Sequence, residues 1–136
     1  MAHVLLIGRE GALLEGLARS LAGAGHVPHV AADAHDAVPP SPRALPLVIV
    51  AERGVATEDT LALLRLPIAT GGALLLYHTG DAPDVPPPAS LQRAVMAELT
   101  LPLERHRLLA LVNRIEERAR LTGRGDRRDT PEPRAP

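Results

Sequence analysis

The apolar stretch from Leu45 to Glu52, with the sequence LPLVIVAE, constrains the fold more than any other part of the chain. It contains three consecutive β-branched residues, and its length suits a strand and is too short for a buried helix. Apolar side chains on both faces predict burial on both sides, as in the middle of a parallel sheet covered by helices. In such sheets ligands bind at the carboxyl ends of the strands. The residues at the end of this stretch are therefore the first candidates for a functional site.

The rest of the chain alternates between strand and helix patterns. Proline residues should shorten the second helix, because proline breaks the backbone hydrogen bonding of a helix. Strands that alternate with helices predict a parallel sheet, and five of them in about 120 residues fit the doubly wound, flavodoxin-like α/β order 2-1-3-4-5. We expect strands at residues 3–7, 26–32, 45–51, 73–77 and 98–101, and helices at 13–23, within 33–43, at 57–66, at 91–96 with Ser90 as cap, and from 103 to about 121.

The length of 136 residues predicts a single domain, which we place at residues 1–121. The segment 122–136 consists mainly of Gly, Arg, Asp and Pro and has no apolar anchor. A segment of this composition cannot bury enough apolar surface to fold. We therefore expect a disordered C-terminal tail.

The composition excludes several classes of function. The chain has no Cys, which excludes disulfides, thiolate metal sites and a thiol nucleophile. One Tyr is its only aromatic residue of the Phe, Trp and Tyr class, and its net charge is −1, so base stacking and electrostatic attraction to nucleic acid are not expected. No signal peptide or membrane-spanning segment is visible in the sequence. We expect a cytoplasmic protein without membrane contact.

Five short segments follow one another along the chain at a characteristic spacing, namely Val4-Leu5-Leu6-Ile7, Leu17-Ala18, Ala24-Gly25-His26, Leu47-Val48-Ile49-Val50 and Thr100-Leu101-Pro102-Leu103. Together they resemble response-regulator receiver domains over residues 4–121, and the last segment is similar to that family's Thr-Lys-Pro-Phe turn. The resemblance implies the receiver fold and a role in two-component signalling.

In receivers, five side chains at strand ends carry the phosphorylation chemistry. They are two acidic residues that help hold Mg²⁺, an acceptor Asp, a Thr or Ser, and a Lys. The resemblance places Gly8 and Arg9, Ala51, His78 and Leu101 at these positions. A shift of one residue would bring in Glu10, Glu52 or Thr79, but no single shift restores all five. If the strand continues to Glu52, this residue points to the opposite face from Ala51.

Each replacement removes a part of that chemistry. Arg9 brings a positive charge to the place where carboxylates should hold Mg²⁺, Ala51 has no nucleophile, and Leu101 cannot neutralise a phosphoryl oxygen. We therefore interpret the chain as a degenerate receiver, or pseudo-receiver. It would be a non-enzymatic, phosphorylation-independent signalling or scaffolding module without a cofactor or metal, acting by protein–protein interaction.

A small-ligand or nucleotide sensor that uses the same strand ends is the alternative. The segment from Gly8 to Gly11 invites a dinucleotide-binding interpretation, but Glu10 and Leu13 stand where that fingerprint requires Gly. Asp33 lies at a suitable distance along the chain to meet a ribose hydroxyl, which keeps the alternative open. The simpler interpretation is that Gly8 and Gly11 permit a tight turn between strand and helix.

The histidines form no convincing metal site in the sequence. His26, His29 and His35, with two nearby Asp residues, are better interpreted as surface or edge histidines, because strand alternation separates His26 from His29. His78 should lie at a strand end beside the degenerate phosphorylation site, and there a plain loop histidine is the favoured interpretation.

The last predicted helix carries the expected partner surface. Leu108, Val112 and Ile115 recur at helical spacing and should face the sheet. Arg105, Arg107 and Arg114 should be exposed and are the residues that we expect to contact a protein partner. The resemblance implies docking or dimerisation through residues 89–121, so a homodimer is one form that the interaction could take.

Overall fold

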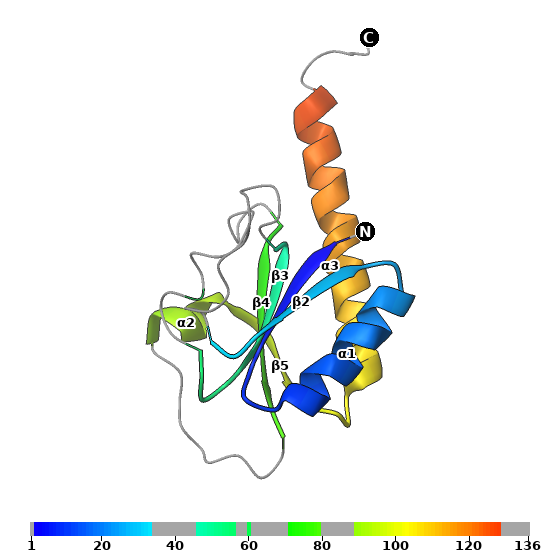
Figure 1. Cartoon of the computed structure of the whole chain (residues 1–136). Helices are drawn as coiled ribbons and strands as arrows, with labels where there is room; N and C mark the ends of the chain where they lie inside the picture. The colour runs from blue at the N-terminus through cyan, green and yellow to red at the C-terminus, as the bar shows by residue number, and fades with distance from the viewer. Residues whose placement is uncertain (1, 34–45, 57–59, 61–70, 80–88, 129–136) are drawn as a thin grey trace.

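The computed structural model describes residues 2–33, 46–56, 60, 71–79 and 89–128, and side chains up to Leu121. Figure 1 shows a central sheet with helices on both sides. The elements follow one another as β1 (His3–Ile7), α1 (Gly11–Gly23), β2 (Val27–Ala31), β3 (Val48–Glu52), β4 (Ala73–His78), α2 (Ala89–Ala94), β5 (Val95–Thr100) and α3 (Arg105–Arg128).

The five strands form one parallel sheet in the order β2-β1-β3-β4-β5, which confirms the predicted fold class and topology. The strand predicted from the apolar stretch lies at the centre of this sheet. Its register places Val48 opposite Val4 of β1 and Ala73 of β4. All five residues of β3 are buried, as the two-sided apolar pattern predicted.

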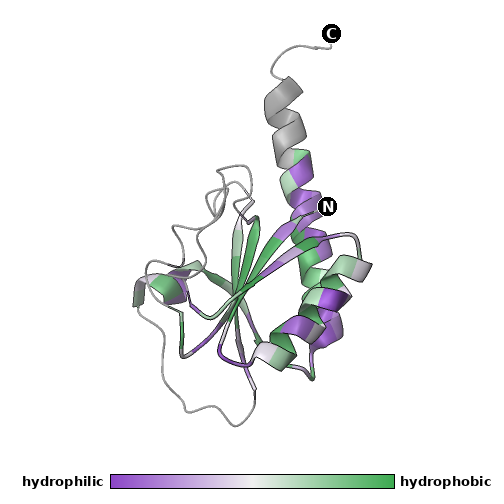
Figure 2. Cartoon of the chain, in the orientation of Figure 1, coloured by the Kyte–Doolittle hydropathy of each residue, from purple (hydrophilic) through white to green (hydrophobic). Residues whose placement is uncertain are grey.

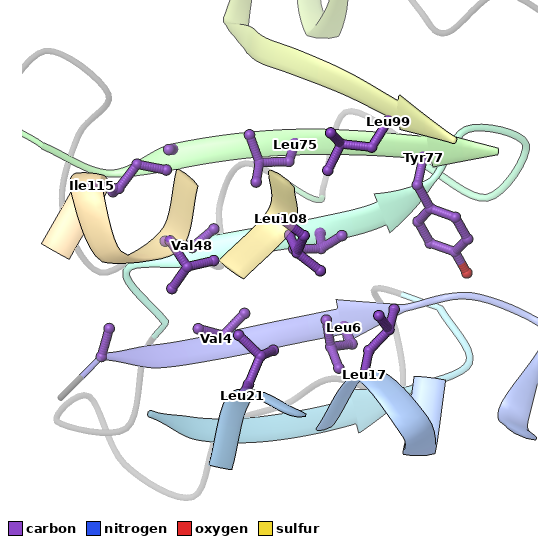
Figure 3. Close-up of a cluster of buried hydrophobic side chains, with 14 of the residues drawn as sticks. Val4, Leu6, Leu17, Leu21, Val48, Leu75, Tyr77, Leu99, Leu108 and Ile115 are labelled. Carbon is purple, nitrogen blue, oxygen red and sulfur yellow. The ribbon is translucent and has the colours of Figure 1, made fainter. Parts of the chain in front are cut away.

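Helices α1 and α3 cover one face of the sheet (Figure 1). Figure 3 shows side chains from both helices converging on those of β1, β3 and β4. We call Leu108, Val112 and Ile115 the α3 core stripe; all three are buried in this cluster, as predicted. The other main contributors are Leu14, Leu17 and Leu21 of α1 and Val4, Leu6, Val48, Val50, Leu75 and Tyr77 of the strands.

The opposite face of the sheet has its own buried cluster. Because successive strand residues alternate between the faces, Ile49 and Ala51 point to this side while Val48, Val50 and Glu52 point to the other. Leu91 of α2 packs into this second cluster. Figure 2 shows hydrophobic residues along the middle of the strands, consistent with a sheet that is covered on both sides.

Several predicted boundaries are wrong. Helix α2 covers Ala89–Ala94, so Ser90 lies inside it and does not cap a helix at 91–96. Strand β5 starts at Val95, earlier than the predicted start at residue 98, because Val95 already pairs with Leu74 of β4. Strand β3 starts at Val48, after the Pro46 and Leu47 of the predicted run.

Helix α3 starts at Arg105 and its backbone runs to Arg128, beyond the predicted end near Leu121. The domain boundary that we place at residue 121 remains a prediction. The shortened second helix, the helix predicted at 57–66, the loop before α2 and the tail from residue 129 lie outside the described residues, apart from Asp33, Thr60 and Thr79.

Candidate functional site

The carboxyl ends of all five strands meet at one edge of the sheet, since the strands are parallel. At this edge Ile7 lies opposite Ala51, and Glu52 lies opposite Tyr77. The first pair points to the α2 side and the second to the α1 and α3 side. The two faces of the edge therefore differ in chemistry, one being apolar and the other carrying a carboxylate and a phenol.

Arg9 and Glu52 form the central polar contact of this edge. The backbone N–H of Arg9 donates to Glu52 Oε1 at 2.8 Å, and the guanidinium donates to the same oxygen through Nε at 3.4 Å and to Oε2 through Nη2 at 2.8 Å. The Glu52 side chain is only 10% exposed, whereas that of Arg9 is 64% exposed. The guanidinium thus covers a buried carboxylate and engages both of its oxygens.

This pairing determines the charge of Glu52. The side-chain hydrogen bonds from Arg9 lower the pKa of the Glu52 carboxyl below its ordinary value of 4.5 and outweigh the opposing effect of burial. The same contact raises the pKa of Arg9. Glu52 is therefore an anion at neutral pH and needs no metal ion to compensate its charge.

Tyr77 extends the contact toward Gly8. A Cβ atom built on Gly8 would overlap the Tyr77 hydroxyl oxygen and lie 3.2 Å from the ring carbon Cζ, so only glycine leaves room for the phenol. The hydroxyl is buried, and no hydrogen-bond partner for it is found within the described part of the chain. Burial, followed by the charge of Glu52, raises the pKa of Tyr77. We call Gly8, Arg9, Glu52 and Tyr77 the strand-end cluster.

The remaining candidates for the phosphorylation site are not part of the strand-end cluster's hydrogen-bonded contact. Ala51 is buried in the apolar cluster on the α2 side. Glu10 precedes α1, is exposed, and makes no side-chain capping bond. Leu101 is fully buried in the cluster under α3, and Thr79 is exposed after β4.

His78 belongs to a second polar group, at the ends of β4 and β5. Its Nε2 lies 3.4 Å from Thr100 Oγ1. The Thr100 backbone N–H donates to Glu104 Oε1 at 2.7 Å. This bond, and then the side-chain bond from Arg107, lowers the pKa of Glu104. His78 ends the strand itself, so the prediction of a plain loop histidine is wrong.

The three Arg residues that are predicted to meet a partner have the predicted exposure. Arg105, Arg107 and Arg114 are all exposed on α3. Arg107 donates to Glu104 at 3.1 Å, within the same turn of the chain. Whether these residues contact a partner remains a prediction.

The predicted description of the histidines as surface or edge residues is wrong for His26. It precedes β2 and is 5% exposed. Its Nδ1 accepts a hydrogen bond from the Ala2 N–H at 3.2 Å, so its Nε2 carries the proton and donates to Asn113 Oδ1 at 2.7 Å. His29 lies on the edge strand β2, as predicted, and His35 lies outside the described residues.

Within the described ranges, no group of three or more His, Asp or Glu side chains is arranged to hold a metal ion. None of the helices there has the length and apolar character that crossing a bilayer requires.

Tyr77 is a member of the site that the sequence patterns did not indicate. A usable signal was present: it is the only Tyr in the chain, and it stands near the end of a predicted strand. The register that sets it beside Glu52 and above Gly8 depends on strands separated in the sequence. Local periodicity does not contain that information.

Comparison with protein-family models and with curated proteins gives no match. Similar solved structures are found. NtrX from Brucella abortus, in complex with ADP, superimposes with a TM-score of 0.65 at 20% identity, over 93% of this chain and 29% of that protein. The chain thus spans less than a third of NtrX.

Two single receiver domains are similar over nearly their whole length. A CheY-like response regulator receiver domain protein from Methanospirillum hungatei gives a TM-score of 0.62 at 14% identity, covering 88% of this chain and 98% of that one. The receiver domain of the Francisella response regulator 1452 gives 0.59 at 16% identity, covering 87% and 98%. At such low identity the agreement concerns the fold.

Proposed function

Because the chain has the fold of response-regulator receiver domains, we propose that it is a two-component-type signalling module that works without phosphorylation. It acts by binding a protein partner and has no enzymatic activity and no cofactor. The proposal rests on one observation above all, namely the Arg9–Glu52 contact at the carboxyl ends of β1 and β3.

A carboxylate that accepts a phosphoryl group needs a free oxygen and a cation that also holds the phosphate. In this chain both oxygens of Glu52 accept hydrogen bonds from Arg9. A Mg²⁺ ion beside this carboxylate would have to compete with the guanidinium of Arg9, which already contacts it. Phosphorylation of Glu52 would have to break this contact and would leave Arg9 without its buried partner.

The neighbouring positions support the same proposal. Ala51, the residue that the resemblance aligns with the acceptor, is a buried methyl group on the opposite face. Leu101, aligned with the family's Lys, is buried in the core. Neither side chain can carry or neutralise a phosphoryl group.

We place the partner surface on the exposed side of α3. Arg105, Arg107 and Arg114 give this side several positive charges. Leu103, two residues before the start of the helix, is 84% exposed and offers an apolar contact at that end of it. A basic surface with an apolar edge fits an acidic protein surface, and the attraction between the two would be weakened by salt.

The central experiment is incubation of the protein with acetyl phosphate and Mg²⁺, followed by intact-mass measurement. We expect no mass increase, while an active receiver domain treated in parallel gains one phosphoryl group. A Mg²⁺-dependent gain of one phosphoryl group that maps to Glu52 would overturn the proposal.

A thermal-shift screen with nucleotides separates this proposal from the small-ligand or nucleotide sensor. A ligand that binds the folded state raises the melting temperature. A nucleotide that stabilises the wild-type chain but not an Arg9→Ala variant would favour a sensor at the strand-end cluster.

A further inference from the structure

His3 and His29 lie side by side on neighbouring strands, away from the carboxyl edge. His3 is the first residue of β1, and His29 pairs in register with Leu5, two residues further along the same strand. The two imidazole rings are parallel within 7°, with centroids 5.4 Å apart. His3 Nδ1 lies 3.2 Å from His29 Nε2.

This separation suits two ligands of one metal ion. Zinc binds imidazole nitrogen at about 2.0–2.1 Å. For a zinc ion at this distance from both nitrogens, the N–Zn–N angle would be about 100°, close to the tetrahedral value. Neutral imidazole is a preferred ligand for Zn²⁺, Cu²⁺ and Ni²⁺. Both side chains are partly exposed, so a hydrated ion can reach them.

We propose that His3 Nδ1 and His29 Nε2 form a binding site for a divalent transition metal ion, for which Zn²⁺ is the reference. Because each histidine is part of a hydrogen-bonded strand, the backbone holds the two ligands near each other before the ion arrives. The bound ion would link β1 to the edge strand β2. Water supplies further ligands of the ion.

The change on binding is small and needs no other reactant. In the metal-free pair, one of the two facing nitrogens donates its N–H to the other. Ligation requires both lone pairs, so the donor ring moves its proton to its other nitrogen by exchange with water. The number of protons bound by the two neutral rings does not change, and no oxidation or reduction takes place.

Two of the other described histidines, His26 and His106, provide the contrast. His26 is buried, and both of its ring nitrogens are engaged, by the Ala2 N–H and by Asn113. His106 is exposed on α3. A His106→Ala variant is therefore a matched control that removes one exposed imidazole and leaves the proposed site intact.

The test is a titration of the full chain with Zn²⁺ by isothermal calorimetry, together with melting curves with and without the metal. We expect one ion per chain, a raised melting temperature, and affinity at least about tenfold weaker for His3→Ala and for His29→Ala, since each removes one of the two proposed histidine ligands. His106→Ala should bind like the wild type. Circular dichroism without metal shows whether each variant is folded.

A spectroscopic measurement keeps the proposal testable if an Ala variant fails to fold. Cu²⁺ bound to the wild-type chain should show coupling to two imidazole nitrogens by electron paramagnetic resonance. The proposal is wrong if no ion binds, if folded His3→Ala or His29→Ala binds with unchanged affinity, or if the bound Cu²⁺ shows fewer than two imidazoles.

Discussion

The α3 core stripe and the strand-end cluster lie on the same face of the sheet and are built differently. Leu108, Val112 and Ile115 belong to the same buried cluster as Tyr77. Figure 3 shows Ile115 and Tyr77 at opposite ends of it. The stripe is formed by apolar side chains of one helix, whereas the strand-end cluster combines a charge pair, a phenol and a glycine from three places in the chain.

The stability of the α3 core stripe depends on general apolar packing, whereas that of the strand-end cluster depends on a particular arrangement of side chains. An aliphatic stripe accepts other apolar side chains of similar volume at modest cost. The strand-end cluster does not, because the Tyr77 hydroxyl needs the absence of a Cβ at Gly8, and Glu52 needs the guanidinium of Arg9.

The largest effect should come from the stripe. Replacing Val112 or Ile115 by Ala should reduce the free energy of unfolding by on the order of 1–4 kcal/mol, because each change leaves a cavity under α3. Urea denaturation measures this loss of unfolding free energy. Arg114→Ala, on the exposed side of the same helix, is the control, and equal losses in both would show that the stripe is not buried.

Gly8→Ala should have the next largest effect. It should reduce the free energy of unfolding by about 1–3 kcal/mol, the range for overpacking a well-filled core. Gly11→Ala is the matched control, since a Cβ at Gly11 meets nothing within 4 Å. Comparable melting temperatures for the two variants would contradict the close approach of Tyr77 to Gly8.

Removing the hydroxyl should rescue Gly8→Ala in part. Tyr77→Phe takes away the oxygen that the new Cβ would overlap and also a buried polar group that lacks a partner in the described structure. Alone, it should leave stability unchanged or raise it, because an unpaired buried hydroxyl is unfavourable. A double-mutant cycle measures the coupling; additive effects would separate the two residues.

Lowering the pH should reduce the stability of the wild type more than that of a Glu52→Gln variant. The pKa of Glu52 is lowered on folding, so its contribution to stability is present above the ordinary value of 4.5 and is lost as the pH falls through the lower, folded-state pKa. The effect should be smaller than that of the core changes, because Arg9 is largely exposed to screening by solvent.

Melting curves of both proteins over the acidic range make the measurement. We expect the wild type to melt higher at neutral pH and the difference to shrink as the carboxylate is protonated. A difference that does not depend on pH would show that the charge of Glu52 does not stabilise the fold.

The smallest effect on stability should come from Arg105, Arg107 and Arg114. Substitution of each by Ala should change the free energy of unfolding by less than about 0.5 kcal/mol, as is usual at exposed positions. The same variants should capture less of a partner, and high salt should weaken capture by the wild type. Variants that melt and bind normally would remove α3 from the partner surface.

Local patterns in the sequence predicted the helices and strands that the structure describes, and their order. The β-branched run around Ile49 predicted the central strand, and the helical spacing of Leu108, Val112 and Ile115 predicted the stripe, because burial depends on periodicity that neighbouring residues carry. The same patterns misplaced the start of β5, since Val95 suits a helix or a strand until it pairs with Leu74.

The sequence alone also singled out Arg9, Glu52 and Ala51 as candidate residues at the strand ends, and it predicted that Ala51 and Glu52 point to opposite faces if the strand continues. It could not determine that Arg9 pairs with Glu52 or that Tyr77 lies above Gly8. Such contacts are fixed by the register between strands far apart in the chain, which only the tertiary structure decides, because many residues together select one alignment of the sheet.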